Sequence, residues 1–177
     1  SLTAEDRDES EKFELALLRR QVQPLIAISG WSTPELEMIY ARAMQLCGAS
    51  GPTDVKFELE RGLYNMHLLR GDLRTADTIA DRLVHAAREE AQRNVREKLL
   101  LIALQTKALP SFYRREFSEA KSWLSEMLSI YDPIVHAGHA LAYGGDPVML
   151  ANSYLAWIDA AQGDAASALA RCEAAIE

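Results

Sequence analysis

The residues best suited to chemistry in this 177-residue chain are concentrated in one segment, residues 132–146. The segment contains Asp132, His136, His139, Tyr143 and Asp146. Two imidazoles three positions apart can share one helical face and, with a carboxylate, ligate a metal ion. The same side chains can instead satisfy the backbone polar groups of a long linker, and the length of the segment favours this structural role.

The sequence lacks the motifs that mark common catalytic and cofactor sites. It contains no GxxxxGK[ST] or GxGxxG loop for phosphates, and no HExxH, CxxC or GxSxG. We therefore expect no catalytic residue, no metal ligand set and no cofactor, and we predict that the chain is not an enzyme.

Composition indicates a folded protein that does not bind nucleic acid. Hydrophobic residues make up 49% of the chain, and 26 acidic against 19 basic residues give a net charge of -7. Nucleic-acid binding needs a positive surface, so an acidic balance argues against it. No apolar run approaches the 18 residues of a membrane span, which predicts no membrane association.

The ends of the chain and its cysteines predict a cytoplasmic location. Residues 1–12 are polar and acidic, unlike a signal peptide, and are expected to form a solvated face or a frayed segment. Cys47 and Cys172 are far apart and form no metal-binding pattern. We expect both to be reduced and buried on apolar helix faces.

Apolar residues recur at three- and four-residue steps and predict about eight helices. Their expected positions are 4–28, 34–47, 53–70, a helix from 73, one around 99–108, one around 117–128, one from 147 and one from 165 to 176. Thr33 and Asp146, each followed by a proline, are expected N-caps. Pro24 should kink or interrupt the first helix near Arg20, and Pro110 should distort the last turn of the fifth.

Three turns share one pattern, which predicts a repeat. The segments are LLRGDLRTA (68–76), FYRREFSEA (112–120) and DAAQGDAASA (159–168). In each, an alanine follows the turn residue by five positions: Ala76 after Gly71, Ala120 after Arg115 and Ala168 after Gly163. The turns are 44 and 48 residues apart, and Gly30, 41 residues before Gly71, precedes a looser fourth copy. We predict an all-α fold of four antiparallel helix hairpins stacked as a solenoid in a single domain, 1–177.

The turn pattern resembles the tetratricopeptide repeat, although its spacing exceeds that family's 34 residues. The chain is also similar to the C-terminal region of bacterial proteins that join a class III adenylate or guanylate cyclase to an AAA-type ATPase. This likeness is carried by PELEMIYARAMQLC (34–47), GLYNMHLLRGDLRTADTIADRLVHAA (62–87) and LSIYDPIVHAGHALAYGGDPVMLANSYLAW (128–157). The resemblance implies a regulatory, protein-binding segment of a signalling protein.

A solenoid of hairpins binds partners along the face formed by the first helix of each hairpin. The residues expected there are Glu58, Arg61, Asn65, Gln105, Tyr113, Ser153 and Trp157, with Leu109 and Phe112 on the same helix as Gln105. Arg61 and Asn65 are four positions apart and can hold a peptide carboxylate or backbone. An equally favoured role for Arg61 is a solvated ion pair with Glu58 or Glu60.

Three functions follow from these observations. The leading hypothesis is a non-catalytic interaction module that binds a peptide, a protein or a neighbouring domain of its parent. The main alternative is a small-molecule or metal sensor that uses the 132–146 linker and the adjacent helices, and a third is a metal-dependent hydrolase built on an α bundle. An exposed apolar face at the end of a solenoid would also allow a homodimer.

Overall fold

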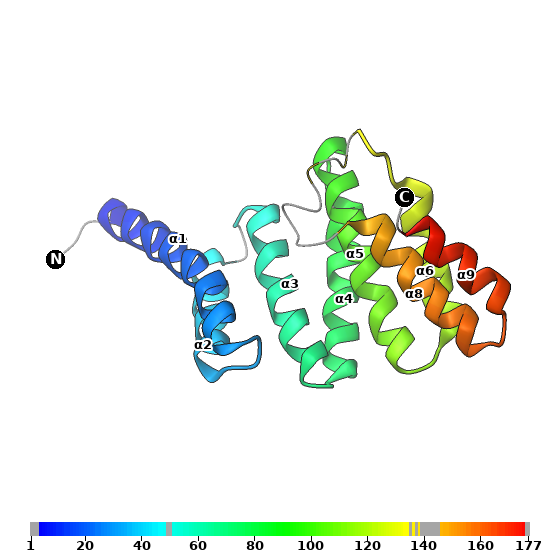
Figure 1. Ribbon diagram of the computed structural model, residues 1–177. Helices are drawn as coiled ribbons and strands as arrows, with labels where there is room; N and C mark the ends of the chain where they lie inside the picture. The colour runs from blue at the N-terminus through cyan, green and yellow to red at the C-terminus, as the bar shows by residue number, and fades with distance from the viewer. Residues whose placement is uncertain (1–3, 49–50, 135, 137, 139–145, 176–177) are drawn as a thin grey trace. The chain divides into compact units, whose positions relative to one another are not determined.

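The computed structural model describes residues 4–48, 51–134, 136, 138 and 146–175, and every regular element in these ranges is an α-helix (Figure 1). The helices are α1 (Ala4–Ser29), α2 (Pro34–Cys47), α3 (Thr53–Leu69), α4 (Leu73–Glu89), α5 (Arg93–Tyr113), α6 (Phe117–Ile130), α8 (Pro147–Ala161) and α9 (Ala165–Ala174). The all-α prediction is confirmed for this part of the chain. The stacking of hairpins into a solenoid stays a prediction.

The chain forms two compact units, Ser1–Ile79 (unit 1) and Ala80–Glu177 (unit 2), and the division falls within α4. Each unit has its own cluster of buried apolar side chains. Burying one such side chain stabilises a fold by roughly 1.5–3 kcal/mol, so each cluster is a substantial core. That the two units form one domain also stays a prediction.

In unit 1, α2 packs against both α1 and α3. The core contains Val22, Leu36, Tyr40, Ala43, Cys47, Val55, Leu59 and Met66. The Thr33 side chain caps α2 as predicted, because its Oγ1 accepts the Leu36 N–H at 3.3 Å. Helices α2 and α3 approach closely at Gly62, where an added Cβ would come within 2.1 Å of the Tyr40 ring.

Helix α1 is not interrupted at Pro24, so that part of our expectation is wrong, and the kink stays a prediction. The helix runs without interruption from Ala4 to Ser29, with Pro24 inside it, and it includes most of the segment expected to fray. Proline removes one backbone donor, but Pro24 lies on an exposed side of the helix, where water can satisfy the carbonyl that lost its partner. Core contacts of Val22 and Ile26 hold the helix on both sides of the proline.

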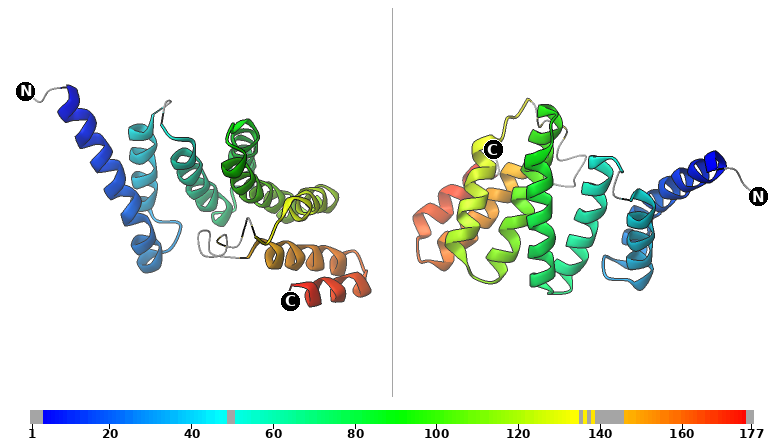
Figure 2. Two further views of the ribbon diagram at one scale, coloured as in Figure 1. Left: turned by 90° about the horizontal axis from the view of Figure 1, so that it is seen from above. Right: turned by 180° about the vertical axis from the view of Figure 1, so that it is seen from behind.

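In unit 2, α5 packs against α6, and α8 packs against α9, α6 and α5. Both additional views show α8 and α9 side by side (Figure 2). The core contains Leu101, Leu104, Ala108, Ala120, Leu124, Met127, Ala151, Leu155 and Ile158. Helix α5 continues through Pro110 to Tyr113, and the distortion expected in its last turn stays a prediction. Pro110 is fully buried, and packing fixes the last turn in a helical conformation.

The three predicted turns have the same hydrogen-bond pattern. Gly71, Arg115 and Gly163 have positive φ angles of 78°, 63° and 84°. Each donates its N–H to the carbonyl three positions back, the next residue donates to the carbonyl five positions back, and the alanine donates to the carbonyl four positions back, all at 2.9–3.1 Å. This Schellman arrangement satisfies the carbonyls at a helix end and reverses the chain. The repeat seen in the sequence is therefore a repeat of turn geometry.

The predicted burial of cysteines is half right. Cys47 is buried in the core of unit 1, whereas Cys172 on α9 is exposed. Helix α9 packs on α8 by one side only, and Leu169, three positions before Cys172, is exposed as well. An apolar helix face therefore did not suffice to predict burial.

Candidate interaction surface

Four aromatic side chains gather on the surface of unit 2. Tyr113 at the end of α5 is 51% exposed, and Trp157 on α8 is 57% exposed. Between them lie Phe112 and Tyr154, both half-buried. We call Phe112, Tyr113, Tyr154 and Trp157 the aromatic patch. A contiguous patch of exposed apolar side chains marks an interaction site more often than a single exposed apolar side chain does.

The rings of the patch contact one another directly. Phe112 lies at the centre, with its ring centroid 5.3 Å from Tyr113, 4.9 Å from Tyr154 and 6.0 Å from Trp157. Tyr154 and Trp157 are 5.0 Å apart. The pairs Phe112–Tyr113, Phe112–Tyr154 and Tyr154–Trp157 meet edge to face, an arrangement that aromatic quadrupoles favour. The two exposed rings therefore rest on a packed base.

Local structure explains how the patch is held. The Arg115 turn directly follows the last turn of α5 and fixes the positions of Phe112 and Tyr113. Helix α8 begins at the predicted cap, where Asp146 Oδ1 accepts the Val148 and Met149 N–H groups at 2.8 and 2.9 Å. Tyr154 and Trp157 are three positions apart and thus share one face of α8.

The patch is uncharged at neutral pH. Burial, followed by the contact with the Tyr113 hydroxyl, raises the pKa of Tyr154 well above its ordinary value of 10. The two hydroxyl oxygens are 3.5 Å apart, at the outer limit of a hydrogen bond. The patch thus offers aromatic faces and hydroxyl groups.

The structure brings together two of the seven predicted binding residues, Tyr113 and Trp157. On the same helices, Gln105 and Ser153 are half-buried, and the Ser153 hydroxyl donates to the Met149 carbonyl at 2.8 Å. Leu109 is buried and so contributes to the core. These three do not belong to the aromatic patch.

The other three predicted residues lie on α3 in unit 1. Glu58 forms an ion pair with Arg19 of α1, so its carboxylate links two helices of the unit. Arg61 and Asn65 are half-buried. The charge of Arg61 opposes the rise that burial causes in the pKa of Tyr40, which reaches about 12. The predicted contact of Arg61 and Asn65 with a peptide stays a prediction.

The described part of the 132–146 linker uses its side chains for structure. His136 is buried, and its Nδ1 accepts the Asp132 N–H at 2.9 Å. The His136 ring stacks on Tyr131 with centroids 5.5 Å apart. Within the described residues, no three His, Cys, Asp or Glu side chains are grouped to hold a metal. His139 and Tyr143 lie outside those residues.

Tyr154 is the patch residue that was not among the predicted binding residues. Its spacing of three from Trp157 was visible, but periodicity does not show that α8 packs against the end of α5. One signal could have identified Tyr154. It is an aromatic residue one helical turn from Trp157, which the sequence already predicts to bind.

Comparison with known proteins gives no family for the chain. No family model, no curated protein and no solved structure matches it. None of the helices in the described residues is sufficiently long and apolar to cross a membrane.

Proposed function

We propose that this chain is a non-catalytic interaction module that binds a protein or peptide through the aromatic patch. One observation supports the proposal: the highly exposed rings of Tyr113 and Trp157 rest on the packed rings of Phe112 and Tyr154. Tyrosine and tryptophan dominate the energetics of protein interfaces because they bury a large area at a small cost in conformational entropy.

The chemistry of the patch suggests how it would bind. An incoming segment would cover the Trp157 and Tyr113 rings with apolar groups, while the tyrosine hydroxyls would bond to its backbone. The base of Phe112 and Tyr154 is already in place, so binding needs little ordering of the protein. No cofactor enters this scheme.

The resemblance to cyclase- and ATPase-linked proteins extends the proposal. On that basis, the partner is another domain of a larger bacterial signalling protein, and the module has a regulatory role in the cytoplasm. The uncharged patch is consistent with a contact between domains, because the centre of an interface is depleted in charged groups.

Site-specific photocrosslinking tests the proposal. A photoreactive phenylalanine analogue would replace Trp157 or Tyr113, and crosslinking would be carried out in the cells that produce the protein. Leu169 would be the control position, because it is similarly exposed and lies on α9 of the same unit. We expect one adduct shared by the two patch positions and absent at position 169. With the identified partner purified, Trp157→Ala should weaken binding by roughly tenfold or more, and Leu169→Ala should not. Identical adducts at all three positions, or binding that Trp157→Ala leaves unchanged, would contradict the proposal.

A further inference from the structure

We infer that two copies of this chain associate through the outer face of α1, with the two helices antiparallel across a two-fold axis. This surface is separate from the aromatic patch. Helix α1 has apolar side chains on two opposite faces. The inner face contributes Val22 to the unit 1 core, with Leu15, Leu18, Leu25 and Ile26 packed against that core.

The outer face of α1 is apolar and uncovered. Phe13 is 67% exposed and Ile28 is 83% exposed, and Leu17 and Pro24 are exposed as well. At 100° per residue, these four positions lie within about 60° of helix arc. They form a stripe along the helix. A helix that is apolar on both sides is typical of one packed between two layers.

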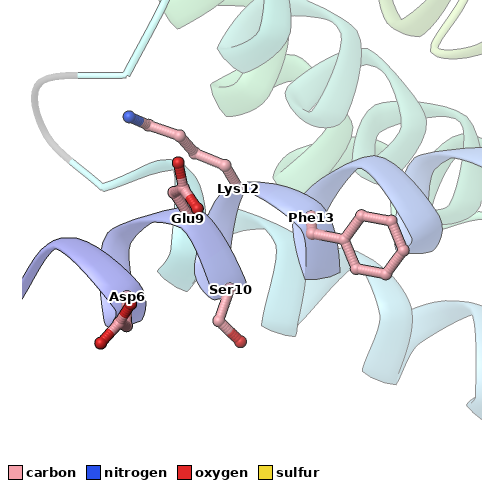
Figure 3. Close-up of a pocket in the computed structure, with 5 residues that line it drawn as sticks. All are labelled: Asp6, Glu9, Ser10, Lys12 and Phe13. Carbon is pink, nitrogen blue, oxygen red and sulfur yellow. The ribbon is translucent and has the colours of Figure 1, made fainter. Parts of the chain in front are cut away.

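An open pocket lies at the N-terminal end of the stripe. Figure 3 shows the five residues that line it, Asp6, Glu9, Ser10, Lys12 and Phe13, all of them on α1. Because one helix supplies every wall, the pocket is open to solvent and cannot enclose a small molecule. Another helix lying across it would cover the Phe13 ring.

The charges along this face select an antiparallel second copy. Glu9 lies before the apolar stripe, and Arg20 lies within the residue range of the stripe on the same side of the helix. Parallel helices would place Glu9 beside Glu9 and Arg20 beside Arg20, which is repulsive. Antiparallel helices related by an axis near residues 14 and 15 place Glu9 of each copy beside Arg20 of the other and bring Phe13 and Leu17 together at the centre. These two apolar residues of the stripe therefore form the contact, and Pro24 and Ile28 lie beyond it.

Other charged groups of α1 are already used within the chain. Lys12 pairs with Asp8 at 2.5 Å, Glu14 pairs with Arg42 at 2.7 Å, and Arg19 pairs with Glu58. Glu9 and Arg20 are thus opposite charges on either side of the proposed axis. A two-fold axis turns such a pattern into a self-complementary one, because each contact occurs twice.

Sedimentation equilibrium of the full chain, in reductant because Cys172 is exposed, tests the inference. We expect a concentration-dependent species of twice the 19.7 kDa chain mass. Phe13→Glu should weaken the dimer by about 100-fold, because it places two charges at the apolar centre. Met38→Glu, at a similarly exposed apolar residue on α2 of the same unit, should leave it unchanged. Circular dichroism would verify that both variants keep their helix content.

A charge exchange then tests the orientation. Glu9→Arg and Arg20→Glu should each weaken the dimer by about tenfold, since each change replaces two attractive contacts with two repulsive ones. The double variant should return to within a few-fold of the original chain. A monomer at all concentrations, a dimer insensitive to Phe13→Glu, or a double variant weaker than either single would overturn the inference. Because Phe13 is not in the aromatic patch, these outcomes do not bear on the proposed function.

Discussion

Exposed ion pairs join helices in both units, but unit 2 also contains interhelical pairs with one buried partner. In unit 1, the ion pairs Arg19–Glu58, Arg42–Glu14 and Arg70–Glu37 connect neighbouring helices at the surface. In unit 2, the carboxylate of Asp159 is only 5% exposed and lies 2.6 Å from the Lys121 ammonium. Arg171 of α9 adds a second, longer contact at 3.9 Å.

This difference shows which contacts determine packing in each unit. A surface ion pair contributes little, because water solvates both groups when the pair separates. A buried carboxylate that loses its partner keeps the full cost of desolvation. Helix packing in unit 1 therefore depends on its apolar core, whereas the docking of α6, α8 and α9 in unit 2 depends also on one interior charge.

The largest expected effect comes from truncating the cores. Leu36 in unit 1 and Leu124 in unit 2 are both fully buried, so Leu36→Ala or Leu124→Ala should destabilise its unit by roughly 3 kcal/mol. Urea denaturation would be followed by fluorescence in variants that keep a single tryptophan, either Trp31 in unit 1 or Trp123 in unit 2. If the chain is one cooperative domain, as predicted, either variant shifts both probes together. A shift confined to one probe would mean two independently folding units.

A smaller effect is expected at the close approach in unit 1. Gly62→Ala should cost about 2 kcal/mol, because the new methyl group overlaps the Tyr40 ring by more than the helix can accommodate. The cost exceeds the stabilisation that alanine ordinarily brings to a helix. In a Tyr40→Leu background the same substitution should cost less. Equal costs in the two backgrounds, measured by urea denaturation, would contradict this explanation.

The difference in burial between the Lys121–Asp159 and Arg42–Glu14 pairs predicts unequal effects of two similar substitutions. Lys121→Ala should destabilise unit 2 by about 1.5 kcal/mol, since it leaves Asp159 buried with only the longer Arg171 contact. Arg42→Ala removes an exposed pair in unit 1 and should give no measurable change in the urea midpoint. Equal effects of the two substitutions would remove the distinction between the units.

The smallest expected effects concern the turns of unit 2. Gly163→Ala should destabilise by about 1 kcal/mol, because a side chain disfavours positive φ even though nothing lies within 4 Å of the new Cβ. Arg115→Gly relieves the same strain and should stabilise by roughly 0.5 kcal/mol. Thermal unfolding would measure both. We expect the two substitutions to shift the midpoint of thermal unfolding in opposite directions. A shift in the same direction would show that positive φ does not strain the two turns equally.

Features set by neighbouring residues could be predicted from the sequence. The caps at Thr33 and Asp146 and the turns at Gly71, Arg115 and Gly163 follow from local backbone chemistry, and all appear where the sequence places them. The helices themselves follow from apolar periodicity. These signals need no knowledge of the rest of the fold.

Features set by tertiary packing could not. Pro24 and Pro110 lie within continuous helices because the cores around them outweigh the lost hydrogen bonds. The exposure of Cys172 depends on what covers α9, which its periodicity does not record. Tyr113 and Trp157 were predicted to bind, but their meeting through Phe112 and Tyr154 depends on the packing of α8 against α5.

The unequal exposure of the two cysteines gives the chain a built-in reporter. A thiol reagent should label Cys172 at once and Cys47 only when the core of unit 1 opens. The two sites lie in different units, so the delay between the first and second label reports the opening rate of unit 1. A maleimide dye added to the folded protein would likewise attach at one place, on α9, without any mutation.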